Sequence, residues 1–314
     1  MRWLYHIAMR ADLRPGWSEH APSSLATEGF VHTSYLTEVS ESARLYYGPG
    51  EDLVVLQIDP RRVGAVVREA ATPRGPMPHV LGPIARSAVA NELTLAALND
   101  APDRVQGTRI AFVAFSGMTL LDLVGVLDPV SRVRTMGFDA TLTCEVVSAT
   151  PGEHVFSAFG LTVRADRVRP ELSAYDLVIV AGGPAAQDLA RDPAITAWLR
   201  APGAHAWMAS VCTGSLLLGA AGHLQGRRAT THETAKDLLA AHGATYVDLR
   251  VVDEGHVITA AGVTAAIDLG LHLVNRLEGP EVEKQIAHQM NVTNAAPVST
   301  DRATNVAARR HRPQ

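Results

Sequence analysis

The chain has only two cysteines, Cys144 and Cys212, among its 314 residues. This number excludes a disulfide framework and a cysteine-rich metal site. No run of about 18 apolar residues occurs, so no helix is predicted to span a membrane. Residues 1–16 contain no apolar stretch of signal-peptide length. We therefore expect a protein of the reducing cytoplasm, without a membrane partner.

Excess positive charge is also missing. Lysine occurs only twice, and the formal net charge is −4. Residues 1–106 hold 10 Lys and Arg against 12 Asp and Glu, and residues 107–314 hold 18 against 20. Neither part is a basic arm, which argues against a nucleic-acid partner. The arginines at 309, 310 and 312 are predicted to be solvated.

The length suits two domains, because domains cluster near 100–150 residues. The sharpest change of composition falls at 99–107, NDAPDRVQG, which is polar and contains Pro and Gly. We predict an α+β domain over 1–100, a linker over 101–107, a second domain over 108–291 and a mobile tail over 292–314.

The first domain is predicted to mix strands and helices. Strands are expected at 2–8 and 52–59, and a turn, a short strand and a helix start at 26–35. Apolar residues recur every four positions in 85–100, which predicts a helix there. Pro and Gly in 74–84 predict a loop.

The second domain alternates between strand and helix patterns. Strands are predicted at 109–115, 144–150, 176–183, 205–211, 227–232 and 256–262, and helices at 119–136, 193–200, 213–224 and 264–279. Such alternation predicts βαβ units and a mostly parallel sheet that helices cover on both faces.

One cysteine stands where an apolar strand runs into a helix. Cys212 follows W-M-A-S-V, and Thr213 and Gly214 open the helix. This is the pattern of a nucleophile elbow, and small residues permit the tight turn. A helix N-terminus favours the thiolate and predicts a lowered pKa for the Cys212 thiol. The alternative is a buried core cysteine, which is our interpretation of Cys144.

A thiol nucleophile needs groups that handle a proton and a developing negative charge. The strand at 176–181 ends in Gly182 and Gly183, whose N–H groups could lie at the same sheet edge as Cys212. A simple tight turn is the alternative. His232 and Asp122 are the candidate proton carriers, although each in isolation also suits a cap or a surface group.

Five segments together resemble the ThiJ/PfpI superfamily, which has the class I glutamine-amidotransferase-like fold. They are F-S-G-M-T-L-L-D-L-V-G (115–125), D-L-V-I-V-A-G-G (176–183), S-V-C-T-G-S-L-L-L-G-A-A-G (210–222), G-R-R-A-T-T-H (226–232) and V-I-T-A-A-G-V-T-A-A-I-D-L-G-L (257–271). The resemblance covers about residues 107–290. It is strongest to isonitrile hydratases and to the sensor domains of AraC-type regulators. It implies a flavodoxin-like three-layer α/β sandwich with a nucleophile elbow.

The resemblance implies roles for four side chains. Cys212 matches the nucleophile, which would add to an isonitrile carbon to give a thioimidate-type intermediate. Asp122, alone or together with Thr213, would carry the proton, and His232 matches a histidine that follows the nucleophile. Water would then release an N-substituted formamide. The implied enzyme is a lyase that acts on a small-molecule substrate and needs no metal or organic cofactor.

Three glycines would form the substrate and oxyanion site by the same resemblance: Gly182, Gly183 and Gly214. The chain departs from the superfamily pattern beside them. Ala181 stands where proline is usual, and Glu233 stands where an aromatic residue is usual. Both positions lie at the rim of the implied pocket, so the departures bear on the identity of the substrate.

Two other functions stay open. A thiol-based stress or redox sensor would use an easily oxidised Cys212, and a reactive-carbonyl protein of the glyoxalase or deglycase type would act without isonitrile activity. AraC-type regulators carry a helix-turn-helix domain after the sensor, whereas about 23 residues follow here, so we expect no DNA binding. The resemblance also implies a homodimer through the C-terminal domain.

The N-terminal part resembles a bacterial family of unknown function, distantly similar to the ADP-ribosyl-transferase fold. The motifs are L-Y-H-I (4–7), E-G-F-V-H-T-S (28–34), D-L-V-V-L-Q-I-D (52–59) and M-P-H-V-L-G-P-I (77–84). His6, His32, Ser34, Glu69 and His79 form its candidate site. They suit acid–base work or dinucleotide binding, and each histidine alone also suits a structural role. No pair has the helix-face spacing of metal ligands.

Overall fold

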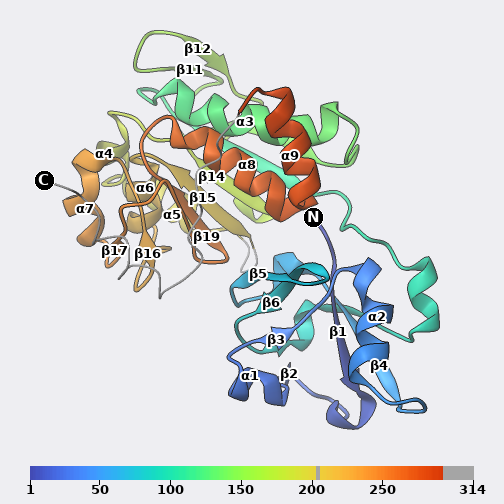
Figure 1. Ribbon diagram of the computed structural model, residues 1–314. Helices are drawn as coiled ribbons and strands as arrows, with labels where there is room; N and C mark the ends of the chain where they lie inside the picture. Colours follow the sequence, from blue (N-terminus) through green and yellow to red (C-terminus); the bar gives the residue numbers. More distant parts are fainter. Residues whose placement is uncertain (203–205, 293–314) are drawn as a thin grey trace, which may run out of the picture.

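The computed structural model describes residues 1–202 and 206–292, so the predicted tail lies outside the described residues except for Val292. The chain forms two parts (Figure 1), of which the N-terminal part is drawn in blue and cyan. No helix among the described residues has the length and apolar character needed to cross a membrane.

A seven-stranded sheet forms the centre of the C-terminal part. Its strand order is β13-β10-β9-β14-β15-β19-β18. The strands are β9 (Arg109–Ala114), β10 (Thr143–Ser148), β13 (Arg167–Val168), β14 (Leu177–Val180), β15 (Trp207–Val211), β18 (Val251–Asp253) and β19 (Val257–Ala260). Every neighbouring pair is parallel except β18 with β19. The central strands β14, β15 and β19 are buried along their whole length because both faces of the sheet are covered.

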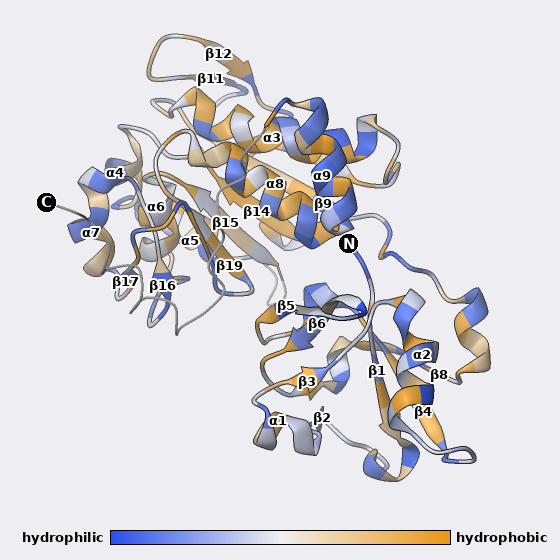
Figure 2. Ribbon diagram, in the orientation of Figure 1, coloured by the Kyte–Doolittle hydropathy of each residue, from blue (hydrophilic) through white to orange (hydrophobic). Residues whose placement is uncertain are grey.

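Helices cover the two faces of this sheet. One group contains α3 (Leu120–Thr135), α8 (Ala265–Glu278) and α9 (Pro280–Gln289). The other contains α4 (Ala186–Leu189), α5 (Pro193–Arg200), α6 (Gly214–Ala220) and α7 (Lys236–Ala240). In Figure 2 the outer helices carry both hydrophilic and hydrophobic residues, as expected for helices with one buried face. The predicted three-layer α/β architecture is confirmed.

Two small pairs of strands lie outside the main sheet. Strands β11 (His154–Phe156) and β12 (Thr162–Arg164) form an antiparallel pair. Strand β16 (Arg228–Ala229) pairs with β17 (Thr245–Tyr246) in a separate sheet. The strand predicted at 227–232 is therefore only two residues long and does not extend the main sheet.

The N-terminal part is α+β, as predicted. Its main antiparallel sheet contains β1 (Leu4–Met9), β4 (Leu53–Ile58) and β8 (Val89–Leu93), and α2 (Leu36–Tyr46) contacts β1. A second sheet has the order β3 (Val31–His32), β6 (Gly75–Val80) and β5 (Val67–Thr72). Strands β2 (Glu19–His20) and β7 (Ile84–Ala85) pair, and α1 (Ser23–Thr27) follows β2.

Two predictions in this part are wrong. The predicted helix at 85–100 is instead β7, a 3₁₀ turn at Arg86–Ala88, β8 and a second 3₁₀ turn at Ala96–Asp100. Pairing of β8 with β4 outweighs the local helical spacing. The predicted loop at 74–84 contains strand β6. The Pro78 carbonyl accepts from the Thr33 N–H, so the polar backbone groups of Pro78 face the side of the two-residue strand β3. The N–H that proline lacks would face the same short strand, so its absence removes few hydrogen bonds from the sheet.

The first three residues belong structurally to the C-terminal part. The Trp3 N–H donates to the Asp103 carbonyl at 3.1 Å, and the Val105 N–H donates to the Met1 carbonyl at 2.7 Å. The Met1 side chain is 1 % exposed within the C-terminal core. The Met1 ammonium lies 3.2 Å from Glu278 Oε1. The N-terminal segment and the linker therefore form one two-stranded strap.

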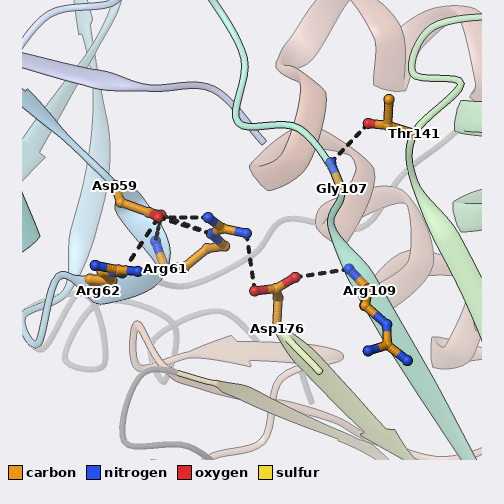
Figure 3. A network of polar contacts seen from close by, with 7 residues as sticks. All are labelled: Asp59, Arg61, Arg62, Gly107, Arg109, Thr141 and Asp176. Atoms are coloured by element: carbon orange, nitrogen blue, oxygen red, sulfur yellow. Dashed lines mark hydrogen bonds and ion pairs between the residues drawn. The ribbon is translucent and has the colours of Figure 1, made fainter. Parts of the chain in front are cut away.

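A polar network joins the two parts at the beginning of the sheet strands (Figure 3). Arg61, in the 3₁₀ turn Pro60–Arg62, donates to Asp59 Oδ2 at 2.7 Å and to Asp176 Oδ1 at 3.1 Å. Asp176 Oδ2 accepts from the Arg109 N–H at 2.8 Å. Asp176 and Arg109 stand at the starts of β14 and β9. The N-terminal part thus contacts the opposite edge of the sheet from the carboxyl ends of its strands.

Candidate active site

Cys212 occupies a strained turn between β15 and α6. Its φ is +56°, in the left-handed region that residues other than glycine seldom adopt. The Cys212 N–H donates to the carbonyls of Ala260 and Ala261 at 3.0 and 2.8 Å. The Cys212 carbonyl accepts from the Ser215 hydroxyl at 3.0 Å. Bonds to β19 and α6 therefore hold the strained residue, which has the geometry of a nucleophile elbow.

Asp122 lies beside the elbow, in the first turn of α3. Its side chain is 0 % exposed, and Oδ2 accepts from the Gly182 N–H at 3.1 Å. Oδ1 has no hydrogen-bond partner among the residues that the structure describes. Burial raises the pKa of Asp122 to about 6, although the Gly182 N–H and the neighbouring Cys212 thiol act in the opposite direction. Asp122 can therefore hold or release a proton near neutral pH.

The Cys212 thiol is protonated in this state. The residue is 5 % exposed, and burial, followed by the negative charge of Asp122, raises the pKa of the thiol to about 11. The Thr213 N–H and hydroxyl act in the opposite direction. The prediction of a lowered pKa is thus wrong for this state, because burial and the carboxylate outweigh the start of a seven-residue helix.

The glycines allow three segments to approach closely. A Cβ on Gly182 would lie 2.7 Å from Thr213 N and 2.8 Å from Asp122 Oδ2. A Cβ on Gly183 would lie 2.5 Å from Thr119 N, and one on Gly214 would lie 2.5 Å from the Val180 carbonyl. No larger residue fits these positions without movement of the backbone.

The N–H groups of the glycine pair are occupied within the protein. The Gly182 N–H donates to Asp122, and the Gly183 N–H donates to Thr213 Oγ1 at 2.8 Å. The Thr213 hydroxyl donates to the Gly183 carbonyl at 3.0 Å. The oxyanion role of these groups stays a prediction. In this structure they orient Asp122 and Thr213 around the thiol.

His232 lies next to this cluster but does not join it. Its Nδ1 is 2.9 Å from the Thr234 hydroxyl, and it caps the 3₁₀ turn Glu233–Ala235. The preceding residue, Thr231, donates to the Cys212 carbonyl at 3.1 Å. Within the described ranges, the His232 ring makes no hydrogen bond to Cys212. The structure therefore brings Asp122 to the thiol and leaves His232 engaged locally.

The N-terminal candidate residues separate into two groups. His6, His32, Ser34 and His79 line one cavity of about 1420 Å³. Glu69 does not line it and instead accepts a hydrogen bond from the Tyr35 hydroxyl. The rings of Phe30 and His79 stack with centroids 3.9 Å apart, and the His32 ring meets the His79 ring edge-on at 5.5 Å.

One functional candidate was missed by sequence reasoning. His20 Nε2 lies 3.0 Å from His6 Nε2 in the same cavity. No spacing signal marks His20, because the pairing of β2 with β7 brings it to His6. Among the described residues, no group of three or more His, Cys, Asp or Glu side chains is placed to hold a metal ion. Cys212 does not line this large cavity.

Comparison with known proteins assigns both parts of the chain to families. Residues 11–92 match a family of proteins of unknown function, DUF952. The chain is 35 % identical over 190 residues to an isonitrile hydratase of Pseudomonas putida, covering 60 % of this chain and 80 % of that protein. It is 35 % identical over 108 residues to a glutathione-independent glyoxalase of Caenorhabditis elegans, covering 34 % of this chain and 58 % of that protein.

A solved structure agrees with this assignment. The crystal structure of a ThiJ/PfpI family protein from Pseudomonas syringae superposes with a TM-score of 0.54 at 29 % identity, over 68 % of this chain and 85 % of that one. Residues 108–276, which carry the elbow and Asp122, match the DJ-1/PfpI family. The chain therefore belongs to the DJ-1/PfpI family.

Proposed function

We propose that the C-terminal domain is a cysteine-dependent hydratase that converts a small isonitrile into an N-substituted formamide. The observation that carries the proposal is the strained Cys212 thiol beside the buried Asp122 carboxyl, which the Gly182 N–H orients. Similarity to an isonitrile hydratase over most of that protein's length supports the choice of substrate class.

The first step joins Cys212 to the substrate. Asp122 accepts the thiol proton while sulfur bonds to the isonitrile carbon, and Asp122 then gives this proton to the same carbon. The product is a thioimidate, R–N=CH–S–Cys212. The Thr213 N–H stabilises the charge on sulfur as it forms. A carboxyl with a pKa of about 6 suits both proton transfers.

Water completes the reaction. Asp122 takes a proton from water as the water oxygen bonds to the thioimidate carbon, and Asp122 then gives this same proton to the nitrogen. The resulting R–NH–CH(OH)–S–Cys212 collapses as the C–S bond breaks, and the hydroxyl proton returns to sulfur through Asp122. The sum is one isonitrile and one water to one N-substituted formamide, with the thiol and carboxyl restored.

A reactive-carbonyl activity is the second candidate, favoured by the similarity to a glyoxalase. The same thiol and carboxyl suit addition to an aldehyde. A peroxide sensor fits the site less well, because reactive sensor thiols are exposed and have a lowered pKa. Cys212 is buried, and its pKa is raised.

The experiment compares formamide release from cyclohexyl isocyanide and p-nitrophenyl isocyanide with lactate formation from methylglyoxal by the full chain. We expect isocyanide turnover that Cys212→Ala abolishes and Cys144→Ala preserves. A mass increase equal to one isonitrile on the Cys212 peptide after rapid quenching would identify the thioimidate. Turnover of methylglyoxal alone would favour the second candidate. Turnover of either substrate by the Cys212 variant would refute the thiol mechanism for that substrate.

Assembly and location belong to the same proposal. We infer a homodimer formed through the C-terminal domain and a cytoplasmic enzyme that acts without a nucleic-acid or membrane partner. Light scattering of the full chain measures the dimer directly. A monomer with full isocyanide turnover would remove the dimer from the proposal and leave the chemistry intact.

A further inference from the structure

The N-terminal cavity has a floor of buried polar side chains that the proposed hydratase does not use. Its volume of about 1420 Å³ exceeds the roughly 300–1,000 Å³ of most small-molecule sites. Five of its lining residues are buried and polar: His6, His20, Thr33, Ser34 and Ser42. Buried polar groups are costly unless something bonds to them, so their hydrogen bonds show what the cavity can bind.

The contacts of His6 fix the proton positions on two imidazoles. His6 Nδ1 lies 2.7 Å from the His32 carbonyl, which can only accept, so Nδ1 carries the proton. Burial lowers the pKa of His6 to about 4, so the ring is neutral and its Nε2 is an acceptor. His20 Nε2, 3.0 Å away, must then donate to it. His20 also has a pKa lowered by burial.

The two hydrogen bonds, from His20 Nε2 to His6 Nε2 and from His6 Nδ1 to the His32 carbonyl, form a histidine relay. This relay leaves a lone pair on His20 Nδ1. A neutral imidazole that carries its proton on Nε2 has an acceptor at Nδ1. Among the described residues, no side chain or backbone group bonds to His20 Nδ1. A bound molecule would therefore need to offer an O–H or N–H donor at this position.

A cation stands elsewhere in the same cavity. Arg74 donates through Nη1 to the Ser42 hydroxyl at 3.0 Å, and Ser42 Oγ lies 3.2 Å from Ser34 Oγ. Within residues 1–202 and 206–292, no carboxylate pairs with Arg74. A guanidinium with adjoining hydroxyls suits an oxyanion. Asp12 places negative charge near His20, so the anionic end of a ligand is directed to Arg74.

We propose that this cavity binds an organic oxyanion, a phosphate ester or a carboxylate, that also carries a hydroxyl or N–H group. The oxyanion lies on Arg74 and the hydroxyls of Ser42 and Ser34, and the donor group lies on His20 Nδ1. The site is distinct from the Cys212 elbow, which is in the other part of the chain.

The test titrates the full chain with four probes by calorimetry. Ribose 5-phosphate and gluconate carry both an oxyanion and hydroxyls, ribose has no anion, and inorganic phosphate has no hydroxyl-bearing carbon. We expect one or both of the first two to bind at least about tenfold more tightly than ribose and inorganic phosphate. Tighter binding of ribose 5-phosphate would indicate a phosphate site, and tighter binding of gluconate would indicate a carboxylate site.

Matched variants locate the binding. Arg74→Met should weaken the probe about tenfold or more, whereas Arg44→Met, on the exposed face of α2, should change nothing. His20→Phe should weaken ribose 5-phosphate or gluconate without abolishing the anion's contact. Cys212→Ala should bind normally, which separates this site from the proposed hydratase.

Nitrogen-15 NMR of the histidine rings tests the relay independently. We expect protons on Nδ1 of His6 and Nε2 of His20, and a shift of the His20 Nδ1 resonance when the probe binds. A proton on His20 Nδ1 would overturn the relay. Binding of ribose as tight as that of ribose 5-phosphate, equal loss in the Arg44 and Arg74 variants, or no binding of either hydroxylated anion would overturn the site.

Discussion

The Cys212 elbow and the N-terminal cavity both bury ionisable side chains. Burial favours the neutral form of each, so it raises the pKa of the acids at the elbow and lowers the pKa of the histidines in the cavity. At the elbow, burial brings a thiol and a carboxyl together and moves the pKa of Asp122 toward neutrality, which prepares a proton transfer. In the cavity, burial suppresses the charge of His6 and fixes both imidazoles as neutral donors and acceptors. The first arrangement suits bond making, and the second suits recognition.

The two sites also differ in access. Cys212 is closed in and does not line the large cavity, whereas His6, His20 and Arg74 face about 1420 Å³ of space. If Cys212 is the nucleophile, as proposed, then a large cavity does not by itself locate the reactive group in this chain. The four predictions below test whether chemistry belongs to the elbow alone.

The largest effect is expected from removal of the thiol. Cys212→Ala should lower isocyanide turnover by roughly 10⁴-fold or more, as loss of a covalent nucleophile does elsewhere. Cys144→Ala is the matched control, because burial raises the pKa of Cys144 to about 12 and keeps it unreactive. Steady-state rates of both variants measure this, and residual turnover from the other domain would break the contrast between the two sites.

Loss of the proposed proton carrier, Asp122, should have the next largest effect. Asp122→Asn should lower kcat/KM by roughly 10²–10⁴-fold, the usual range for general acid–base catalysis. In the wild type, kcat/KM should rise with pH through about 6, because only the carboxylate accepts the thiol proton. The thiol–carboxyl pair titrates jointly, so this limb belongs to the pair. If kcat/KM of the Asp122→Asn variant still rises with pH through about 6, Asp122 is not the group that accepts the thiol proton.

Stability supplies the control for that variant. Burial raises the folded-state pKa of Asp122 above its unfolded value, so the folded state is favoured while Asp122 is protonated. The wild type should therefore lose this contribution as pH rises from about 4 to about 6. The asparagine variant should not, so denaturation at several pH values separates lost catalysis from lost folding.

A methyl group at Gly182 should have a moderate effect. Gly182→Ala places a Cβ 2.7 Å from Thr213 N and 2.8 Å from Asp122 Oδ2, so the carboxyl must move. We expect a loss of about 1–3 kcal/mol in unfolding free energy, as in other overpacked sites, together with reduced turnover. Gly160→Ala in the β11–β12 turn meets open space and controls for general effects of replacing glycine, although its positive φ adds local strain.

The smallest effect is expected at the contact between the two parts. Asp176→Asn weakens the ion pair with Arg61, while Arg61 keeps its pair with Asp59 and the amide oxygen can still accept from the Arg109 N–H. This change should lower the unfolding free energy by about 1 kcal/mol or less. Isocyanide turnover should not change, because this contact lies at the opposite edge of the sheet from Cys212. Thermal unfolding and kinetics on the same preparation test this, and altered turnover would show that the two parts are coupled.

The elbow could be predicted from the sequence because the residues that determine it are neighbours in the chain. An apolar strand, Cys212 and small residues follow one another, and the structure has the strained φ that this order predicts. The pKa of the thiol could not be predicted, since it depends first on burial and then on Asp122, which is 90 positions away in the chain. The hydrogen bonds of Gly182 and Gly183 also depend on this packing.

The N-terminal part was harder to predict because pairing between distant segments determines it. The spacing in 85–100 is helical, but β4 offers a partner that turns Val89–Leu93 into a strand. His20 enters the cavity through a two-residue strand that leaves no pattern in the sequence. Glu69 follows β5 to Tyr35 instead of entering the cavity.

The strap formed by residues 1–3 and the linker has a mechanical consequence. The two ends of the N-terminal part are the two paired segments of this strap. The N-terminal part is therefore attached to the C-terminal core at both of its ends. A body held by one strand can swivel freely, whereas one held by two paired strands bends mainly about a single axis. Relative motion of the two parts would then open and close their contact at Arg61 and Asp176 like a hinge, while the elbow at the far edge stays undisturbed.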